Sequence, residues 1–125
     1  MLRTNTSLKP YNTFDIEVFA EYYAEFDSVI SLTQLLNKRK DRPLFILGGG
    51  SNILLTQNYN GLVLKNEILG LKTIEENSNS VVIEAGAGMN WHSFVLSCIE
   101  KNFGGLENLS LIPGNVGASP MQNIG

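Results

Sequence analysis

The stretch Leu44-Phe45-Ile46-Leu47-Gly48-Gly49-Gly50-Ser51-Asn52-Ile53-Leu54-Leu55 consists of two short apolar runs separated by three glycines, a serine and an asparagine. Short apolar runs bounded by turn formers are typical of buried strands. Glycine adopts positive φ and carries no Cβ, so consecutive glycines let a ligand approach the backbone and let successive N–H groups converge on one anion. The stretch therefore predicts a strand, a phosphate-binding turn and a second strand.

This turn differs from the two common nucleotide motifs. No Lys or Arg lies between Gly48 and Leu55, so a phosphate would be held by neutral donors, with Ser51 and Asn52 adding side-chain donors. Each hydrogen bond to a charged group is worth roughly 1.5–3 kcal/mol, so several hold a diphosphate. The dinucleotide fingerprint requires glycine where this chain has Ile53, and the P-loop triplet Gly-Lys-Ser/Thr is absent from the sequence. Taken alone, a triple glycine is more often an ordinary tight turn.

Length and composition narrow the class of protein. The chain has 125 residues, 43% of them hydrophobic, which fits one domain or two small lobes sharing a core. A net charge of −3 offers no basic surface, so neither nucleic acid nor a membrane is an expected partner. One cysteine excludes an internal disulfide, and the start has no apolar run typical of a signal peptide, so we expect a cytoplasmic protein. The Gly/Pro-rich end at Gly125 lacks a closing helix or strand, so we expect a longer protein.

The first half of the chain predicts a βαβ unit. Aromatic residues 22–26 indicate a strand, and residues 29–36 indicate a helix that Asp27 or Ser28 can cap. Its predicted apolar face consists of Val29, Leu32, Leu35 and Leu36. The strand at residues 44–47 completes the unit and should run parallel to the first, so the glycine turn leaves the carboxyl end of a parallel strand, where α/β sheets usually bind ligands.

Two flanking segments complete the first lobe. Residues 8–14 are predicted to be an extended arm, because Pro10 disfavours helix at Lys9. Asn60-Gly61 predicts a turn before a short strand at residues 62–64.

The pattern changes to strands beyond Gly70. Residues 71–76 and 81–85, separated by a polar Asn/Ser turn, predict a hairpin that opens a second lobe. We place the two lobes at residues 1–67 and 68–125. Asn90 is a good N-cap for a helix that ends at Gly104-Gly105. The buried face of that helix is predicted to consist of Trp91, Phe94, Val95 and Cys98.

Titratable side chains give little indication of chemistry. His92, the only histidine, lies beside the predicted buried face, and without a second histidine, a cysteine pair or clustered carboxylates we expect no metal site. Cys98 is interpreted as a core residue, since free cysteine is among the most buried residue types. Glu75 and Glu76 are interpreted as a solvated strand edge.

A second glycine segment lies at the end of the chain, Ile112-Pro113-Gly114-Asn115-Val116-Gly117-Ala118-Ser119-Pro120-Met121-Gln122-Asn123-Ile124-Gly125. Its small residues permit close backbone approach, and its serine and amide side chains are neutral donors or acceptors. An ordinary Gly/Pro loop is the alternative. Two lysine-free glycine segments, one per lobe, favour an extended diphosphate ligand lying between the lobes.

Several motifs carry a resemblance to a known family. They are Leu8-Lys9-Pro10-Tyr11-Asn12-Thr13-Phe14, Gly48-Gly49-Gly50-Ser51-Asn52, Gly86-Ala87-Gly88 with Trp91-His92, Gly105-Leu106-Glu107-Asn108 and the segment 112–125. The chain resembles the front portion of the bacterial UDP-N-acetylenolpyruvoylglucosamine reductases, flavoenzymes of the PCMH-type (vanillyl-alcohol-oxidase) FAD-binding fold. Pro120-Met121-Gln122-Asn123-Ile124-Gly125 is the most specific match.

The resemblance implies an α+β, PCMH-type fold with a βαβ-containing first lobe and an incomplete second α+β lobe, and it implies FAD as cofactor. The residues implied for the FAD diphosphate are Gly48, Gly49, Gly50, Ser51, Asn52 and Ile53. Those implied for the diphosphate and flavin are Ile112, Pro113, Gly114, Gly117, Ala118, Ser119 and Ile124. Relatives vary at Asn115 and Ala118.

The implied reaction belongs to peptidoglycan precursor synthesis. NADPH delivers a hydride to FAD, and reduced flavin delivers it to the enolpyruvyl double bond of UDP-N-acetylglucosamine enolpyruvate, which yields UDP-N-acetylmuramate. The family's catalytic arginine, serine and glutamate belong to segments after Gly125, so none is assigned here, and the 125 residues alone are expected to be inactive. Two alternatives stay open: another PCMH-type flavin oxidase or dehydrogenase, and a nucleotide-binding module without chemistry. The sequence leaves the oligomeric state open.

Overall fold

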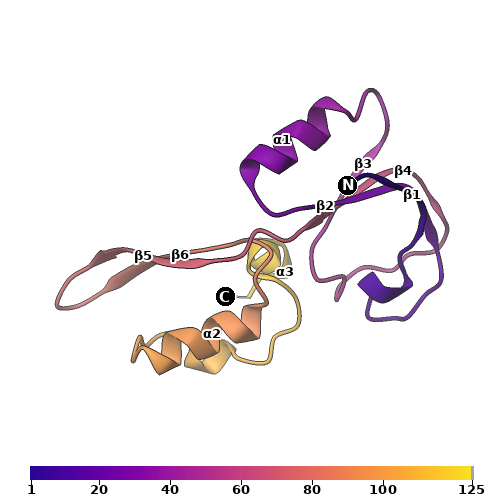
Figure 1. The fold of residues 1–125 in the computed structure, drawn as a ribbon. Helices are drawn as coiled ribbons and strands as arrows, with labels where there is room; N and C mark the ends of the chain where they lie inside the picture. The colour runs from indigo at the N-terminus through magenta and orange to yellow at the C-terminus, as the bar shows by residue number, and fades with distance from the viewer. Residues whose placement is uncertain (125) are drawn as a thin grey trace. The chain divides into compact units, whose positions relative to one another are not determined.

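The computed structural model describes residues 1–124, so Gly125, the last residue of the 120–125 motif, lies outside the described residues. The chain divides into two compact units, Met1–Glu67 and Ile68–Gly125. Each unit combines strands and helices (Figure 1).

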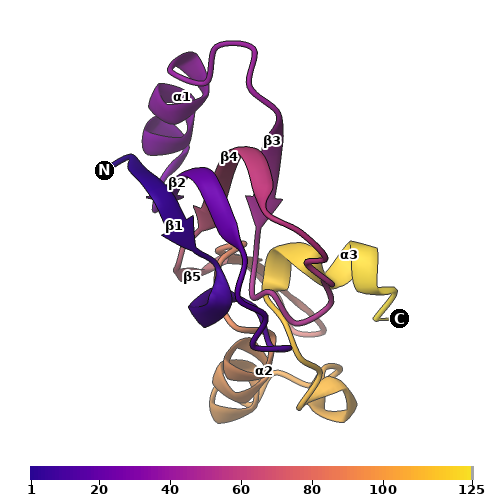
Figure 2. The ribbon, with the colours of Figure 1, turned by 90° about the vertical axis from the view of Figure 1, so that its right-hand side faces the viewer.

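The first unit is built on a four-stranded sheet with the order β1-β2-β4-β3. Its strands are β1 (Arg3–Ser7), β2 (Phe19–Phe26), β3 (Leu44–Leu47) and β4 (Tyr59–Asn66). β1 pairs antiparallel with β2, whereas β2 and β3 both pair parallel with β4, which lies between them (Figure 2). The predicted parallel direction of β2 and β3 is therefore confirmed.

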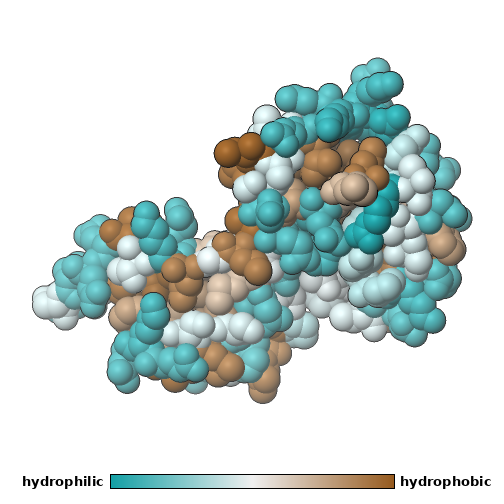
Figure 3. All heavy atoms as spheres, in the orientation of Figure 1, coloured by the Kyte–Doolittle hydropathy of each residue, from teal (hydrophilic) through white to brown (hydrophobic). Residues whose placement is uncertain are grey.

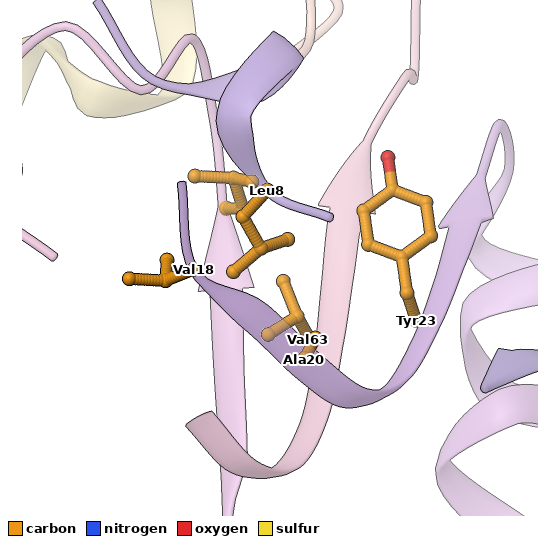
Figure 4. Packing of buried hydrophobic residues seen from close by; sticks show 6 residues of the cluster. Leu8, Val18, Ala20, Tyr23 and Val63 are labelled. Carbon is orange, nitrogen blue, oxygen red and sulfur yellow. The ribbon is translucent and has the colours of Figure 1, made fainter. Parts of the chain in front are cut away.

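One face of this sheet carries the core of the first unit. The segment from Leu8 to Val18 folds over it, and the Leu8 N–H donates to the Val18 carbonyl oxygen at 2.8 Å. Figure 4 shows the side chains packed together there. The buried residues are Leu8, Val18, Ala20, Tyr23, Leu47 and Val63.

The helix α1 (Val29–Asn37) is less buried than its predicted apolar face suggests. Leu32 and Leu35 are half-buried, but Val29 is 69% exposed and Leu36 is also exposed. Figure 3 shows hydrophobic surface over this helix. The predicted apolar face is therefore only partly covered. The Arg42 guanidinium stacks over the ring of Tyr22, in β2, at 4.2 Å.

The predicted strand at residues 62–64 is confirmed as part of β4, but one strand prediction and one turn prediction in this unit were wrong. Residues 53–55 form no strand, because Ile53 and Leu55 reach the core with their side chains while the backbone pairs with no strand. Asn60-Gly61 belongs to β4 rather than to a turn. A Cβ on Gly61 would lie 2.5 Å from the Pro43 carbonyl oxygen, so glycine is needed for this close approach inside a strand.

The predicted extended arm contains a 3₁₀ turn, η1 (Lys9–Tyr11), with Pro10 in its first turn, where the missing N–H costs nothing. β1 was not predicted, since its polar sequence Arg-Thr-Asn-Thr-Ser has no apolar alternation. The strand at residues 22–26 in fact begins at Phe19.

The second unit opens with the predicted hairpin. β5 (Leu71–Glu76) and β6 (Val81–Ala85) pair antiparallel, which confirms both strands. In the turn between them the Asn77 Oδ1 accepts hydrogen bonds from the Asn79 and Ser80 N–H groups at 2.9 and 3.0 Å. This Asx turn explains why the polar sequence reverses the chain.

The helix α2 (Trp91–Glu100) has Asn90 as its N-cap and buries Trp91, Phe94, Val95 and Cys98, as predicted. Its end was predicted wrongly. Asn102 takes the left-handed conformation at φ 59°, and the Phe103 N–H donates to the Cys98 carbonyl oxygen at 2.9 Å. This Schellman-type cap ends the helix before Gly104-Gly105.

The rest of the second unit is wound into short turns. They are η2 (Glu107–Leu109), η3 (Val116–Ala118) and α3 (Ser119–Gln122). The end of the chain therefore carries a short helix, which the Gly/Pro content did not predict.

Candidate functional site

The first glycine loop begins at the carboxyl end of β3, where the βαβ argument placed it. Gly50 is buried and left-handed, with φ 66°. Within residues 1–124, the backbone N–H groups of Gly49, Gly50, Ser51 and Asn52 donate no hydrogen bond. A left-handed residue in a run of unpaired N–H groups has the character of an anion-binding nest. The side chains of Ser51 and Asn52 also make no hydrogen bond within this range.

The N-terminal arm fixes the conformation of this loop. The Gly50 carbonyl oxygen accepts hydrogen bonds from the Thr13 N–H at 3.1 Å and from the Thr13 hydroxyl at 3.4 Å. A Cβ on Gly50 would clash with the carbonyl oxygen of Tyr11. Gly50 is therefore required both by its left-handed φ and by the arm packed against it.

Asn12 organises the arm. It is 8% exposed, and its side-chain Nδ2 donates to the carbonyl oxygens of Leu8 and Ile16 at 2.9 and 3.0 Å. Its Oδ1 accepts from the Ile16 N–H at 3.0 Å. One amide thus closes the arm on itself and presents Thr13 to the glycine loop, a role that the sequence motif alone did not assign.

Tyr11 anchors the arm to the sheet. Its ring stacks on that of Tyr23 at 4.9 Å between centroids, and the Tyr23 hydroxyl donates to Glu25 Oε1 at 2.9 Å. Burial, followed by the hydrogen bond with Tyr11, raises the pKa of Tyr23. Tyr23 therefore stays neutral and acts as a structural support.

Gly48 differs from Gly50, because a Cβ placed on it would meet no atom within 4 Å. The space beside its backbone is open, as a ligand-facing glycine requires. Gly49 is exposed, and the half-buried Ile53 packs against the core, which anchors the far end of the loop.

Hydrogen bonds hold the second glycine loop against residues 87–91, which lead into α2. The Trp91 N–H donates to the Gly114 carbonyl oxygen at 2.9 Å, and the Val116 N–H donates to the Met89 carbonyl oxygen at 2.8 Å. The Gly117 N–H donates to the Ala87 carbonyl oxygen at 2.9 Å. These bonds explain why the Gly86-Ala87-Gly88 and 112–125 motifs occur together in the sequence.

The backbone N–H groups of this loop fall into two groups, those with a hydrogen-bond partner and those without one. The N–H groups of Gly117, Ala118 and Ser119 are committed to partners inside the unit. Those of Gly114 and Asn115 have no partner within residues 1–124. Among residues 114–119, the unpaired main-chain donors therefore lie at the beginning of the loop.

The other predicted residues of this loop contribute in different ways. Ile112 and Ile124 pack against the second unit's core, and Pro113 is exposed. Ser119, Gln122 and Asn123 make no side-chain hydrogen bond within the described range, so their side chains are available as neutral donors or acceptors. Gly114 is buried and has φ 111°.

His92 and Trp91 shape the segment that leads into this loop. The Leu111 N–H donates to His92 Nδ1 at 3.1 Å, while Trp91 Nε1 donates to the Leu109 carbonyl oxygen at 2.8 Å. Leu111 is left-handed at φ 64°, a conformation that glycine, which has no Cβ, adopts more easily. The imidazole of the single histidine thus accepts a hydrogen bond from the backbone, which the sequence did not indicate.

The remaining candidates are structural. Cys98 is buried, and burial raises the pKa of its thiol, so it is a core residue as interpreted. Glu75 and Glu76 are exposed, as expected of a solvated edge. In residues 1–124, no group of three or more His, Cys, Asp or Glu side chains is placed to hold a metal ion. None of the helices in this range has the length and hydropathy that a membrane span requires.

The residues present fit a diphosphate-containing cofactor. The first loop combines open space at Gly48, a left-handed Gly50 and unpaired N–H groups. The second loop, taken by itself, has unpaired N–H groups at Gly114 and Asn115. All these donors are neutral, so they match an anion by hydrogen bonds rather than by opposite charge.

Comparison with known proteins identifies the class. Residues 22–125 match the model of the FAD binding domain family, and the chain belongs to that family. It is similar, over nearly all of its length, to proteins named UDP-N-acetylenolpyruvoylglucosamine reductase. The relative from Flavobacterium johnsoniae is 50% identical over 124 residues, 99% of this chain and 37% of the relative. The relative from Chromobacterium violaceum is 47% identical over 125 residues, 98% of this chain and 37% of the relative.

A solved structure has the same fold. The crystal structure of UDP-N-acetylenolpyruvylglucosamine reductase (MurB) from Thermus caldophilus matches with a TM-score of 0.67 and 22% identity, covering 95% of this chain and 41% of that one. The α+β, PCMH-type FAD-binding fold and the resemblance to the reductases are therefore confirmed. The chain spans about 37% of the length of the curated relatives described here.

Proposed function

We propose that this chain is the FAD-binding portion of an NADPH-dependent reductase that converts UDP-N-acetylglucosamine enolpyruvate to UDP-N-acetylmuramate. The proposal is supported by the 47–50% identity to relatives of that name and by a glycine loop with free neutral donors. We propose the cytoplasm as its location and the UDP-sugar as its substrate.

The first loop binds the cofactor's diphosphate in this proposal. Gly49, Gly50, Ser51 and Asn52 donate main-chain hydrogen bonds, and Gly48 leaves room for the ligand to approach. Thr13 and Asn12 fix the conformation of Gly50 before the anion binds. The loop therefore loses little conformational entropy on binding.

In the second unit, we propose that the Gly114 N–H donates to the cofactor and that the Gly117 N–H holds the loop to the Ala87 carbonyl oxygen. The residues proposed to line the cofactor in this unit are Ile112, Pro113, Ala118, Ser119 and Ile124. Bound FAD would supply the hydride-transfer chemistry between NADPH and the enolpyruvyl double bond. The groups that stabilise the resulting charge on the substrate carboxylate and supply a proton are proposed to lie after residue 125.

The experiment is to express the complete reading frame that contains this chain. The purified protein should show flavin absorbance and should oxidise NADPH only when UDP-N-acetylglucosamine enolpyruvate is present. Reduction of the oxidised flavin by a hydroxy acid or an alcohol, in place of NADPH, would indicate the other flavin enzyme class. A protein that cannot be reconstituted with FAD would reject the proposal.

A further inference from the structure

Asn115 is a nearly enclosed polar residue without a polar partner. It is 8% exposed, and its side-chain amide makes no hydrogen bond with any other residue in the range 1–124. Every fully shielded side-chain polar atom in that range has a partner, so the Asn115 amide reaches the surface while the rest of the residue is enclosed. A polar group in such surroundings is usually hydrogen-bonded, and here a ligand can supply the bond.

The backbone on both sides of Asn115 is fixed. Asn115 and Asn90 form an antiparallel bridge whose two hydrogen bonds are Trp91 N–H to Gly114 and Val116 N–H to Met89, at 2.9 and 2.8 Å. In this bridge the Asn115 N–H points away from Asn90, and the Asn115 carbonyl oxygen accepts from the Ala118 N–H at 3.0 Å. The residue is therefore positioned before any ligand binds.

Three unpaired donors belong to two adjacent residues. They are the Gly114 N–H, the Asn115 N–H and the Asn115 side-chain amide, and Gly114 is left-handed at φ 111°. The carbonyl oxygens of both residues already accept hydrogen bonds. A site rich in donors, with its main-chain acceptors engaged, favours an anionic ligand.

We infer that the Asn115 side chain donates from Nδ2 to a phosphate oxygen of the FAD diphosphate. This rests on the proposed function and adds a residue to it, because the resemblance implies Gly114 but assigns no side-chain role to the variable position 115. The amide supplies in this chain a contact that a residue without a donor cannot supply.

The test compares Asn115→Ala and Asn115→Asp in the protein expressed from its complete reading frame, with Asn108→Asp as the matched control. Asn108 is exposed in the same unit and makes no side-chain hydrogen bond within the described range. The control substitution therefore adds the same negative charge at a position away from the proposed contact. Affinity for FAD and for riboflavin, which lacks the diphosphate, is measured by flavin fluorescence. The melting temperature is measured without flavin.

We expect Asn115→Ala to weaken FAD binding about tenfold, and Asn115→Asp to weaken it more, because a carboxylate repels the diphosphate. Riboflavin affinity should be unchanged in both, and Asn108→Asp should match the unchanged protein. Asn115→Ala with unaltered FAD affinity overturns the inference, as does equal weakening for FAD and riboflavin. An unchanged protein that binds no FAD rejects the proposed function itself and the inference with it, so the two failures are distinguishable.

Discussion

The three consecutive glycines of the first loop have different roles at the scale of single residues. Gly50 is left-handed and lies against the Tyr11 carbonyl oxygen, whereas the space beside Gly48 is empty. Gly50 therefore permits the fold, and Gly48 permits a ligand to approach. A matched pair of alanine substitutions separates the two roles.

Gly50→Ala should destabilise the protein even without FAD. The left-handed conformation costs roughly 1–2 kcal/mol for a residue with a Cβ, and the clash with Tyr11 adds to it. Urea unfolding of the FAD-free protein measures the effect. Unfolding at the same urea concentration as the unchanged protein would show that the arm does not enclose this glycine.

Gly48→Ala should change FAD-free stability by no more than about 0.5 kcal/mol, because the new methyl group meets nothing and φ is not left-handed. Its FAD affinity should fall about tenfold or more, since the methyl group occupies the ligand's space. Parallel urea and flavin-fluorescence titrations decide this. Full affinity in this variant would place the ligand elsewhere.

Asn12→Ala removes three hydrogen bonds inside the arm and leaves the Ile16 N–H and carbonyl oxygen without their partner, while the Leu8 carbonyl oxygen keeps the Tyr11 N–H. We expect a loss of about 1–3 kcal/mol in the free energy of unfolding. Weaker FAD binding should accompany it, because Thr13 then holds Gly50 less firmly. Gln57→Ala, at an exposed position, is the control. A loss confined to stability, with FAD affinity intact, would separate the arm from the site.

At the scale of elements, α1 begins with a capping box. The Ser28 side chain accepts from the Ser31 N–H at 3.2 Å, the Ser31 hydroxyl accepts from the Ser28 N–H at 3.1 Å, and Asp27 Oδ1 accepts from the Ser31 hydroxyl at 3.0 Å. The hydrogen bond from Ser31 lowers the pKa of Asp27. The contribution to stability is present above the ordinary carboxyl pKa and is lost as the pH falls through the lowered value.

Ser31→Ala should therefore raise the pKa of Asp27 toward its ordinary value, and α1 should fray at less acidic pH than in the unchanged protein. An NMR titration of the Asp27 carboxyl carbon tests this. Identical titration curves for the two proteins would show that Ser31 does not set this pKa.

Elements with a strong local pattern were predictable from the sequence. The hairpin follows from alternation around an Asn/Ser turn, and the buried face of α2 follows from the spacing of Trp91, Phe94, Val95 and Cys98. β1 and the 3₁₀ turn in the arm were missed, because tertiary partners such as β2 and Asn12 determine them. Gly61 was wrongly predicted to lie in a turn for the same reason, since its role depends on the close approach of Pro43, eighteen residues earlier.

The candidate site was predictable as a set of segments but not as a set of donors. Both glycine loops were identified by composition. Which N–H groups of the second loop remain free depends on the acceptors Ala87 and Met89, which lie far from the loop in the sequence. For the same reason the sequence could not single out Asn115 or assign His92 as a backbone acceptor.

At the scale of the whole molecule, the two units differ in how their strands are buried. Ala24, Val63 and Leu64 in β2 and β4 are fully shielded, whereas the residues of β5 after Leu71 are all exposed. A two-stranded hairpin has little stability of its own. Local stability should therefore be greatest in the four-stranded sheet.

Hydrogen–deuterium exchange should accordingly be slowest in β2 and β4 and much faster in β5 and β6. Mass spectrometry of peptides from the FAD-free protein measures both regions together. Equal protection of the hairpin and the four-stranded sheet would contradict the burial described here.

The central claim is that uncharged main-chain N–H groups bind the cofactor's diphosphate. A ¹⁵N–¹H NMR titration with FAD tests it most directly, using riboflavin as the ligand without phosphates. The account predicts that the amide resonances of Gly49, Gly50, Ser51, Asn52, Gly114 and Asn115 shift with FAD and stay largely in place with riboflavin. FAD binding that leaves these six resonances unmoved would contradict the account.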